Sequence, residues 1–143
     1  MSKNNKLIGQ FGEKIAACFI VDNGSSIICR NYKCRYGEID IISTAGKDLV
    51  FIEVKTRQNI NYGYPFESVT ESKIKKIKKA SQYFLLNESL LQNYQYNLRF
   101  NIISIIISGE LTAAVLVQKD KNPIDISILK IGSDYELEQI TDI

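Results

Sequence analysis

YGEIDIISTAGKDLVFIEVKTR, residues 36–57, contains two runs rich in β-branched and aromatic residues on either side of the sequence AGKD. Such runs are typical of β-strands, and residues 45–48 between them are typical of a tight turn. The segment therefore predicts a β-hairpin. With these four residues as the turn, Thr44 lies opposite Leu49, and the rest of the register can be counted outward from this pair.

Two acids face each other in this register, because Asp40 falls opposite Glu53. Directly opposed residues have Cβ atoms roughly 4.5–5.5 Å apart, and like charges so placed are destabilising. A divalent cation between the two carboxylates would remove the conflict. Lys55 lies two residues beyond Glu53 on the same face, opposite Glu38. The pattern predicts a carboxylate–metal–lysine site, and the alternative is a surface ion-pair ladder of Glu38, Glu53 and Lys55.

Alternation of side chains along the two strands sorts the residues of the hairpin into two faces. One face is expected to carry Glu38, Asp40, Ile42, Leu49, Phe51, Glu53, Lys55 and Arg57. The other is expected to carry only aliphatic residues, Ile39, Ile41, Val50, Ile52 and Val54.

The composition limits the chemistry. The chain has 143 residues, 45% of them apolar and 24% charged, which predicts one globular domain over residues 1–143. It contains no histidine, which excludes histidine general bases and histidine-ligated metals. Any metal site must use oxygen ligands, which favour Mg²⁺ with Mn²⁺ as a substitute. The three cysteines are expected to be reduced, buried residues.

Neither a transmembrane run of about 20 apolar residues nor a signal peptide is evident in the sequence. We therefore expect a cytoplasmic protein without membrane contact.

Hydrophobic periodicity predicts the remaining elements. Helices are expected over residues 7–23 and 71–86, the second with Thr70 as its N-cap. Strands are expected over residues 26–33, 98–108, 111–117 and 124–131, with a charged turn over 119–123. The acidic tail, about residues 132–143, is expected to be frayed or a short helix. A central sheet with helices on its faces is the economical packing, so the fold class is α/β.

The second helix carries a dense row of lysines, Lys73, Lys75, Lys76, Lys78 and Lys79, although the net charge of the chain is only +2. Such a row is usually a solvated helix face, and contact with phosphates is the alternative. The loop at residues 58–65 contains Tyr62 and Tyr64. These tyrosines could either stack on nucleic-acid bases or cover the core.

Several motifs together resemble the YraN-like family of small bacterial proteins. They are GQFGE at residues 9–13, RNY at 30–32, GEID at 37–40, FIEVKTR at 51–57, PFESVTESK at 65–73 and RFNII at 99–103. That family belongs to the PD-(D/E)XK endonuclease-like superfamily, which includes restriction enzymes and Holliday-junction resolvases.

The resemblance implies a restriction-endonuclease-like αβββαβ core with a central mixed sheet flanked by helices. It implies that Asp40 and Glu53 bind the metal and that Lys55 is catalytic. Glu13 would add an acid from the first helix, while Glu38 and Arg57 match positions beside the site. Two departures are Ile39, where the superfamily signature has proline, and Asn101, where the family pattern RFD has aspartate.

These features lead to the hypothesis of a Mg²⁺-dependent nuclease acting on DNA, including branched or recombination intermediates. The Val54 carbonyl is a candidate further metal ligand, and Glu13 or Glu38 could complete the metal shell or accept a proton. Nucleic-acid contacts are expected at Arg57, Lys73, Lys75, Lys76 and Lys79. Cleavage of both strands of a duplex would require a homodimer. The alternatives are a nucleic-acid-binding module with little or no activity, and a protein-interaction adaptor.

Overall fold

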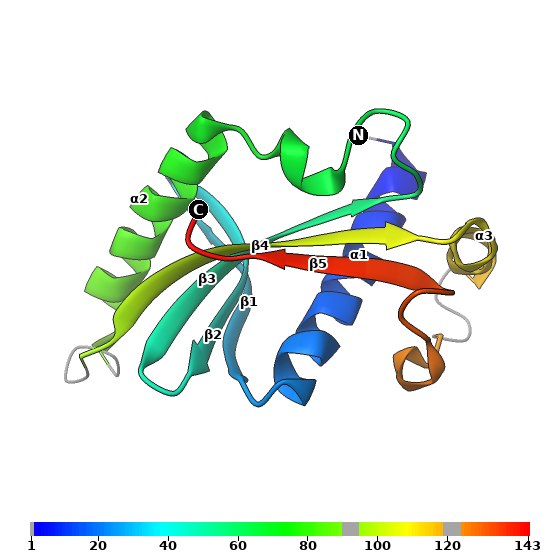
Figure 1. The fold of residues 1–143 in the computed structure, drawn as a ribbon. Helices are drawn as coiled ribbons and strands as arrows, with labels where there is room; N and C mark the ends of the chain where they lie inside the picture. Colours follow the sequence, from blue (N-terminus) through cyan, green and yellow to red (C-terminus); the bar gives the residue numbers. More distant parts are fainter. Residues whose placement is uncertain (1, 90–94, 119–123) are drawn as a thin grey trace.

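The computed structural model describes residues 2–89, 95–118 and 124–143 and contains a five-stranded mixed sheet in the order β1-β2-β3-β4-β5 (Figure 1). The strands are β1 Ser26–Cys34, β2 Gly37–Ala45, β3 Asp48–Arg57, β4 Asn97–Ile107 and β5 Tyr135–Ile140. The helices are α1 Lys3–Asp22, α2 Glu71–Asn87 and α3 Gly109–Gln118, with 3₁₀ turns η1 Pro65–Ser68 and η3 Ile126–Ile128.

The order of the elements confirms the predicted αβββαβ core and the α/β class. β1, β2 and β3 pair antiparallel, whereas β3 and β4 are parallel and are connected through α2. β5 then pairs antiparallel with β4. None of the helices in the described ranges is long and apolar enough to cross a membrane.

The predicted hairpin register is confirmed. Thr44 pairs with Leu49, and the ladder between β2 and β3 runs from the pair Ala45–Asp48 at the turn to the pair Ile41–Ile52. The next residues in this register, Asp40 and Glu53, lie just beyond the last ladder pair. The hairpin therefore brings the two acids to the point where regular pairing between β2 and β3 ends.

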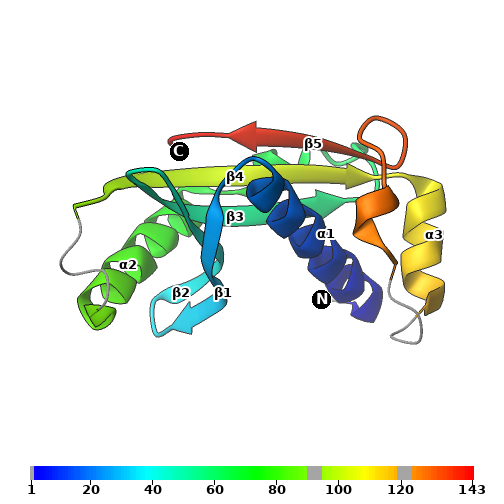
Figure 2. The same cartoon turned by 90° about the horizontal axis from the view of Figure 1, so that it is seen from below.

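Two apolar clusters cover the two faces of the sheet. On one face, α1 and α3 pack on alternate residues of β3 and β4, including Ile52 and Ile103. On the other, Ile77 and Phe84 of α2 pack against β2 and β3, with Phe51 at the centre. Figure 2 shows the β1–β2 end of the sheet between α1 and α2. Residues from both helices can therefore approach this end.

One expectation about the faces of β2 is wrong. Ile39 packs with Ile42 on the α2 face, and not with Ile41 on the α1 face. The alternation is interrupted at Asp40, whose neighbour in the β1 register, Asn31, has a positive φ of 54°. A left-handed residue breaks the regular pleat of β1, and β2 departs from strict alternation beside it.

Residues 111–117, predicted as a strand, belong to helix α3. Ser108 caps this helix, because its hydroxyl oxygen accepts from the Leu111 N–H at 3.1 Å and its carbonyl from the Thr112 N–H at 2.9 Å. Glu110 in the first turn suits the positive end of the helix dipole. The cap and the alanines that follow outweigh the β propensity of the apolar residues.

The last strand also differs from the prediction. Residues 124–131 contain the 3₁₀ turn η3, and the acidic tail forms edge strand β5. Leu137 and Tyr135 pack on the core, while Glu136 and Glu138 alternate with them. This period-2 pattern is that of a strand with one buried face. The predicted charged turn at 119–123 lies outside the described residues.

Helix α2 begins as predicted, because the Thr70 hydroxyl accepts from the Lys73 N–H at 3.2 Å. The Ser68 hydroxyl donates to the Pro65 carbonyl at 2.7 Å and does not cap this helix.

The three cysteines are free thiols, as expected, but they are not buried. Cys18 is exposed on α1, and Cys29 and Cys34 of β1 are half-buried. Both strand cysteines lie along β1, an edge strand of the sheet, where cover by other elements is incomplete.

Gly12 lies at a close contact between α1 and β3. A Cβ placed on Gly12 would clash with the Thr56 hydroxyl and lie only 2.8 Å from Thr56 Cβ. We expect Gly12→Ala to lower the free energy of unfolding by about 1–3 kcal/mol, because rotating the threonine cannot relieve both contacts. Chemical denaturation measures this loss.

The matched control is Gly9→Ala, one turn earlier in α1, where an added Cβ meets nothing within 4 Å. The free energy of unfolding of this variant should rise by about 0.5–1 kcal/mol, because alanine has a higher helix propensity than glycine. Equal effects of the two substitutions would contradict close packing of α1 on β3.

Candidate active site

Asp40 is tied to β3 at the end of the hairpin ladder. Its Oδ2 accepts a hydrogen bond from the Val54 backbone N–H at 2.8 Å. Regular pairing of β2 with β3 stops at Ile52, so the Val54 N–H lies beyond the paired part of β3. It donates to the side chain of Asp40 and not to the backbone of β2. This bond fixes the Asp40 carboxylate beside Glu53, the neighbour of Val54. It also links Val54 to the site through its N–H.

Glu53 is a buried carboxylate with two cationic partners. Its side chain is only 3% exposed. One oxygen, Oε1, lies 3.2 Å from Lys55 Nζ and 3.6 Å from Lys73 Nζ. The other oxygen, Oε2, is buried and has no hydrogen-bond partner among the described residues. A buried carboxylate oxygen without a partner is costly, so Glu53 can accept a further ligand there.

The pKa of Asp40 is raised from 3.8 to about 7. Burial is the largest cause, and the negative charge of Glu53 is the next. The hydrogen bond from Val54 opposes this shift, as does the positive charge of Lys73, while the charge of Glu13 adds to it. Two acids in one poorly solvated place are thus electrostatically frustrated, as the hairpin register predicts.

Glu13 of α1 lies within the same electrostatic field. Burial raises its pKa, and the charges of Glu38 and Glu53 raise it further, while Arg30 and Lys33 lower it. The structure therefore brings the predicted first-helix acid toward the hairpin acids.

Glu38 does not face Lys55 as the extended register predicts. Because the β2–β3 ladder ends at Ile41–Ile52, Glu38 pairs instead with Lys33 of β1, at 3.7 Å between Nζ and Oε2. Both side chains of this pair are exposed. The surface ion-pair ladder considered for Glu53 is therefore wrong, because Glu53 is buried and Glu38 has another partner.

The acids fit a metal that needs few protein ligands. Within the described ranges, no three acidic or thiol side chains gather as a ready-made metal cage. Mg²⁺ is commonly held by one or two carboxylates plus water and substrate phosphates. Asp40 and Glu53, with the unpartnered Glu53 Oε2, are suited to this mode of binding.

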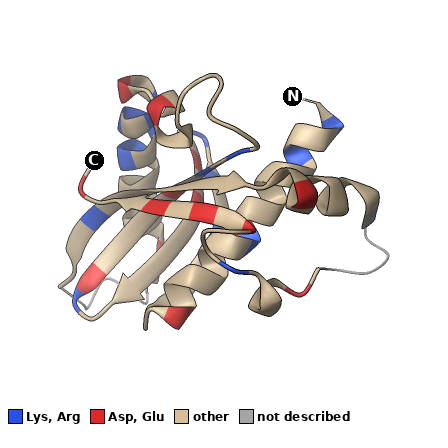
Figure 3. Cartoon of the chain, turned by 45° about the vertical axis from the view of Figure 1, so that its right-hand side comes forward, with Lys and Arg blue, Asp and Glu red and all other residues tan. Residues whose placement is uncertain are grey.

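The lysines of α2 divide into two groups. Lys75, Lys76 and Lys79 are exposed, and Figure 3 shows basic residues along this helix. Lys73 is partly buried and reaches Glu53. The sequence carried a signal for this difference, since Lys73 lies one turn before the buried Ile77 on the same helical stripe.

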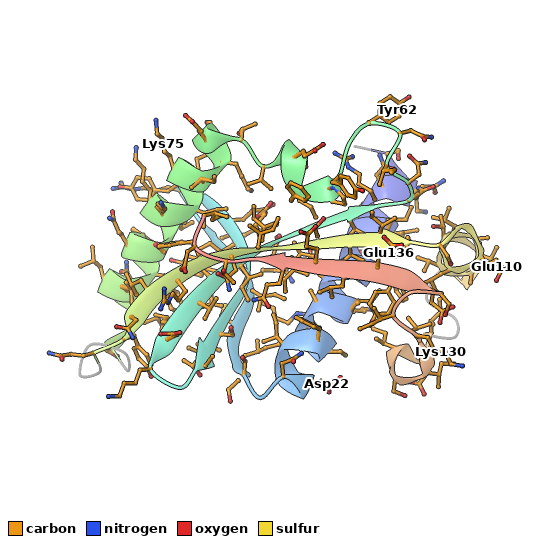
Figure 4. The ribbon with its side chains drawn as sticks, viewed as in Figure 1. Asp22, Tyr62, Lys75, Glu110, Lys130 and Glu136 are labelled. Atoms are coloured by element: carbon orange, nitrogen blue, oxygen red, sulfur yellow. The ribbon has the colours of Figure 1, made fainter. Side chains whose placement is uncertain are left out.

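The loop after β3 exposes an aromatic residue. Tyr62 is 98% exposed and points away from the body of the protein, so it does not cover the core (Figure 4). Tyr64 stacks on Phe66 at 5.8 Å between ring centroids. Arg57, the last residue of β3, is exposed. These side chains follow directly from the strand that carries Glu53 and Lys55.

Asn101 lies away from the carboxylate pair. It is buried in β4 opposite Ile52, on the α1 face, and its Oδ1 accepts from the Asp142 N–H at 3.3 Å. It lines a cavity of about 290 Å³ together with Arg99 and Asp48. The amide that replaces the expected aspartate therefore has a structural role in joining β4 to the C-terminal residues.

The raised pKa of Asp40 makes stability depend on pH. The folded carboxyl keeps its proton up to about pH 7, whereas its unfolded value is 3.8. The contribution of the Asp40 carboxyl to the free energy of unfolding is therefore fully present below about pH 4 and is lost as pH rises to about 7. The free energy of unfolding of Asp40→Asn, relative to that of wild type, should rise by on the order of 1–3 kcal/mol between pH 4 and pH 7.5. Denaturation curves in EDTA measure this gain.

Asp22→Asn, at the exposed end of α1, controls for a general effect of removing one negative charge. A difference between Asp40→Asn and wild type that stays constant across this pH range would contradict the electrostatic conflict at Asp40.

Comparison with known proteins identifies the family. The family model described as "Uncharacterised protein family UPF0102" matches residues 12–105. A UPF0102 protein of Clostridium novyi (strain NT) is 45% identical over 104 residues, 73% of this chain and 84% of the relative. One from Caldicellulosiruptor bescii is 42% identical over 107 residues, 75% and 88% of the two chains. The chain therefore belongs to the UPF0102 family, which confirms the predicted YraN-like membership.

Proposed function

We propose that this protein is a Mg²⁺-dependent nuclease that hydrolyses phosphodiester bonds of DNA. The observation that carries the proposal is the pair of acids at the end of a hairpin, half-buried Asp40 and buried Glu53, with Lys55 at 3.2 Å from Glu53. A structural ion pair would need only one acid. Burial, together with the negative charge of Glu53 beside it, raises the pKa of Asp40 to about 7, and such shifts are typical of functional sites.

Asp40 and Glu53 would hold the metal, through Asp40 and the unpartnered Glu53 Oε2. When bound, Mg²⁺ neutralises charge on a phosphodiester and lowers the pKa of water, and Mn²⁺ can substitute for it. The Val54 N–H keeps the Asp40 carboxylate in position by its hydrogen bond. Glu13 of α1, whose pKa the charge of Glu53 helps to raise, would accept a proton from water near the pair.

Lys55 supplies the positive charge nearest to Glu53, at 3.2 Å against 3.6 Å for Lys73. Its ammonium is partly exposed while Glu53 is buried, so it can contact a phosphate without leaving Glu53. A cation at this place stabilises the negative charge that develops on the phosphate oxygens during cleavage.

Exposed basic residues lie on α2 and in the β1–β2 turn. Those on α2 are Lys75, Lys76 and Lys79. Lys76 lies next to the β1–β2 turn, because a Cβ on Gly37 would be 3.6 Å from Lys76 Cβ. In that turn Arg35 is held over the Tyr36 ring at 4.8 Å. A nucleic-acid backbone lying across the turn and α2 would meet positive charge along its length.

The cleavage assay uses Mg²⁺ or Mn²⁺ with branched, single-stranded and duplex DNA. We expect Lys55→Ala to reduce the rate about 10²–10³-fold, because the charge facing the phosphate is lost. Asp40→Asn and Glu53→Gln should reduce it at least as much, because they remove the carboxylates that hold the metal. If wild type cuts no better than Lys55→Ala, the catalytic proposal is wrong.

Lys130→Ala serves as the control, because Lys130 is exposed near α3, at the end of the molecule remote from α2 (Figure 4). It should cut as wild type does. Gel filtration of the active species tests the homodimer that cutting both strands of a duplex would require.

The alternative is a nucleic-acid-binding module with little or no cleavage. One observation favours it: Lys55 and Lys73 already pair with the buried Glu53 carboxylate without a metal. The acids would then serve to fix two lysines beside a bound backbone.

DNA binding measured in EDTA tests the proposed basic surface of α2 without metal-dependent cleavage. Neutralising Lys75, Lys76 and Lys79 together should weaken binding and lower the slope of log K against log salt by about 0.9 for each duplex phosphate that is no longer neutralised. Asp40→Asn should bind as wild type does. Unchanged salt dependence in the triple variant would show that α2 does not contact the backbone.

A further inference from the structure

Lys73 enters the carboxylate site from a different element than the other charged groups. Asp40, Glu53 and Lys55 all belong to the β2–β3 hairpin, whereas Lys73 is in the first turn of α2. Its ammonium lies 3.6 Å from Glu53 Oε1. Its charge also acts on Asp40, whose pKa it lowers. One flexible cation therefore serves both of the acids that are suited to a metal.

The site already holds positive charge without a metal. The ammonium groups of Lys55 and Lys73 both pair with the Glu53 carboxylate, and the charge of Lys73 also acts on Asp40. A divalent cation added to this set would sit within a few ångströms of two positive charges. Its repulsion from both ammonium groups is strong where solvation is poor. Moving one ammonium outward relieves this repulsion and keeps the attraction of the metal to the carboxylates.

We propose that the Lys73 ammonium stands in for the divalent metal, holding Glu53 and Asp40 in the metal-free protein and being displaced when the metal binds. This inference rests on the proposed metal site but not on cleavage. It makes Lys73 a positioning residue and a competitor of the metal, a role distinct from the phosphate contact that its place in the lysine row predicts.

Lys73 is the better candidate for displacement than Lys55. Its contact with Glu53 is the longer of the two, at 3.6 Å against 3.2 Å. Lys55 shares strand β3 with Glu53, so its backbone keeps it near. The Lys73 ammonium ends a long, flexible side chain that is partly exposed and can turn outward beside Lys76. A displaced Lys73 would thus add to the basic face of α2.

The test is calorimetric titration of the full chain with Mn²⁺, and with Mg²⁺, at constant pH and salt. Lys73→Met keeps the length and packing of the side chain but removes its charge. We expect this variant to bind Mn²⁺ about tenfold more tightly or better than wild type. Lys73→Arg restores a fixed cation and should return the affinity to the wild-type value or below. Lys75→Met, on the same helix but pointing away from the body, should leave it unchanged (Figure 4).

Thermal unfolding gives a second readout. Without metal, Lys73→Met should melt below wild type, because Glu53 loses one of its two counter-ions. Saturating Mn²⁺ should raise its melting temperature more than that of wild type, so the deficit shrinks or reverses. A variant with a merely structural defect would keep the same deficit at every Mn²⁺ concentration.

Any of three results would overturn the inference. The first is that folded Lys73→Met binds Mn²⁺ no more tightly than wild type, and the second is that no variant binds Mn²⁺. The third is that the Lys73→Met variant still binds Mn²⁺ tightly when Asp40→Asn is added. The nuclease proposal is judged separately by cleavage. If Lys73→Met binds Mn²⁺ more tightly and wild type cuts no DNA, the inference stands and the nuclease fails.

Discussion

The burial of the Glu53 carboxylate in the middle of a sheet is the constraint on which the surrounding structure depends. An ionised group with 3% exposure must be compensated, and the chain provides two ammonium groups on one of its oxygens. The same burial, with Glu53 beside it, raises the pKa of Asp40. The interrupted pleat at Asp40, the side-chain bond to Val54 and the inward lysine of α2 all accommodate this one charge.

The fold makes the accommodation possible because α1 and α2 cover opposite faces of the same strands. The β1–β2 end of the sheet lies between the two helices. Lys73 of α2 therefore pairs with Glu53, and Glu13 of α1 comes close enough for the charge of Glu53 to act on it. Gly12 lets α1 come close enough, since a side chain there would strike Thr56. The site therefore depends on helix packing as much as on the hairpin that carries it.

Local rules predicted the hairpin and the opposition of Asp40 and Glu53, because a two-strand register can be counted from its turn. They failed where tertiary or capping effects decide: Ser108 converts an apolar run into α3, and pairing with β4 turns an acidic tail into β5. The row of lysines predicts that Lys73 lies with its neighbours on the solvated face of α2. Its helical stripe with Ile77 indicates otherwise, but only knowledge of what α2 covers reveals that an acid lies there.

The parallel pairing of β3 with β4 has a consequence for how the chain folds. It joins Asp48 to Asn97, 49 positions apart, whereas β1, β2 and β3 connect through short turns. Closing the longer loop costs more chain entropy and is expected to follow hairpin formation. Every side chain of the carboxylate site lies ahead of β4 in the sequence. During synthesis, the acids and their lysines therefore leave the ribosome before the strand that completes the central sheet.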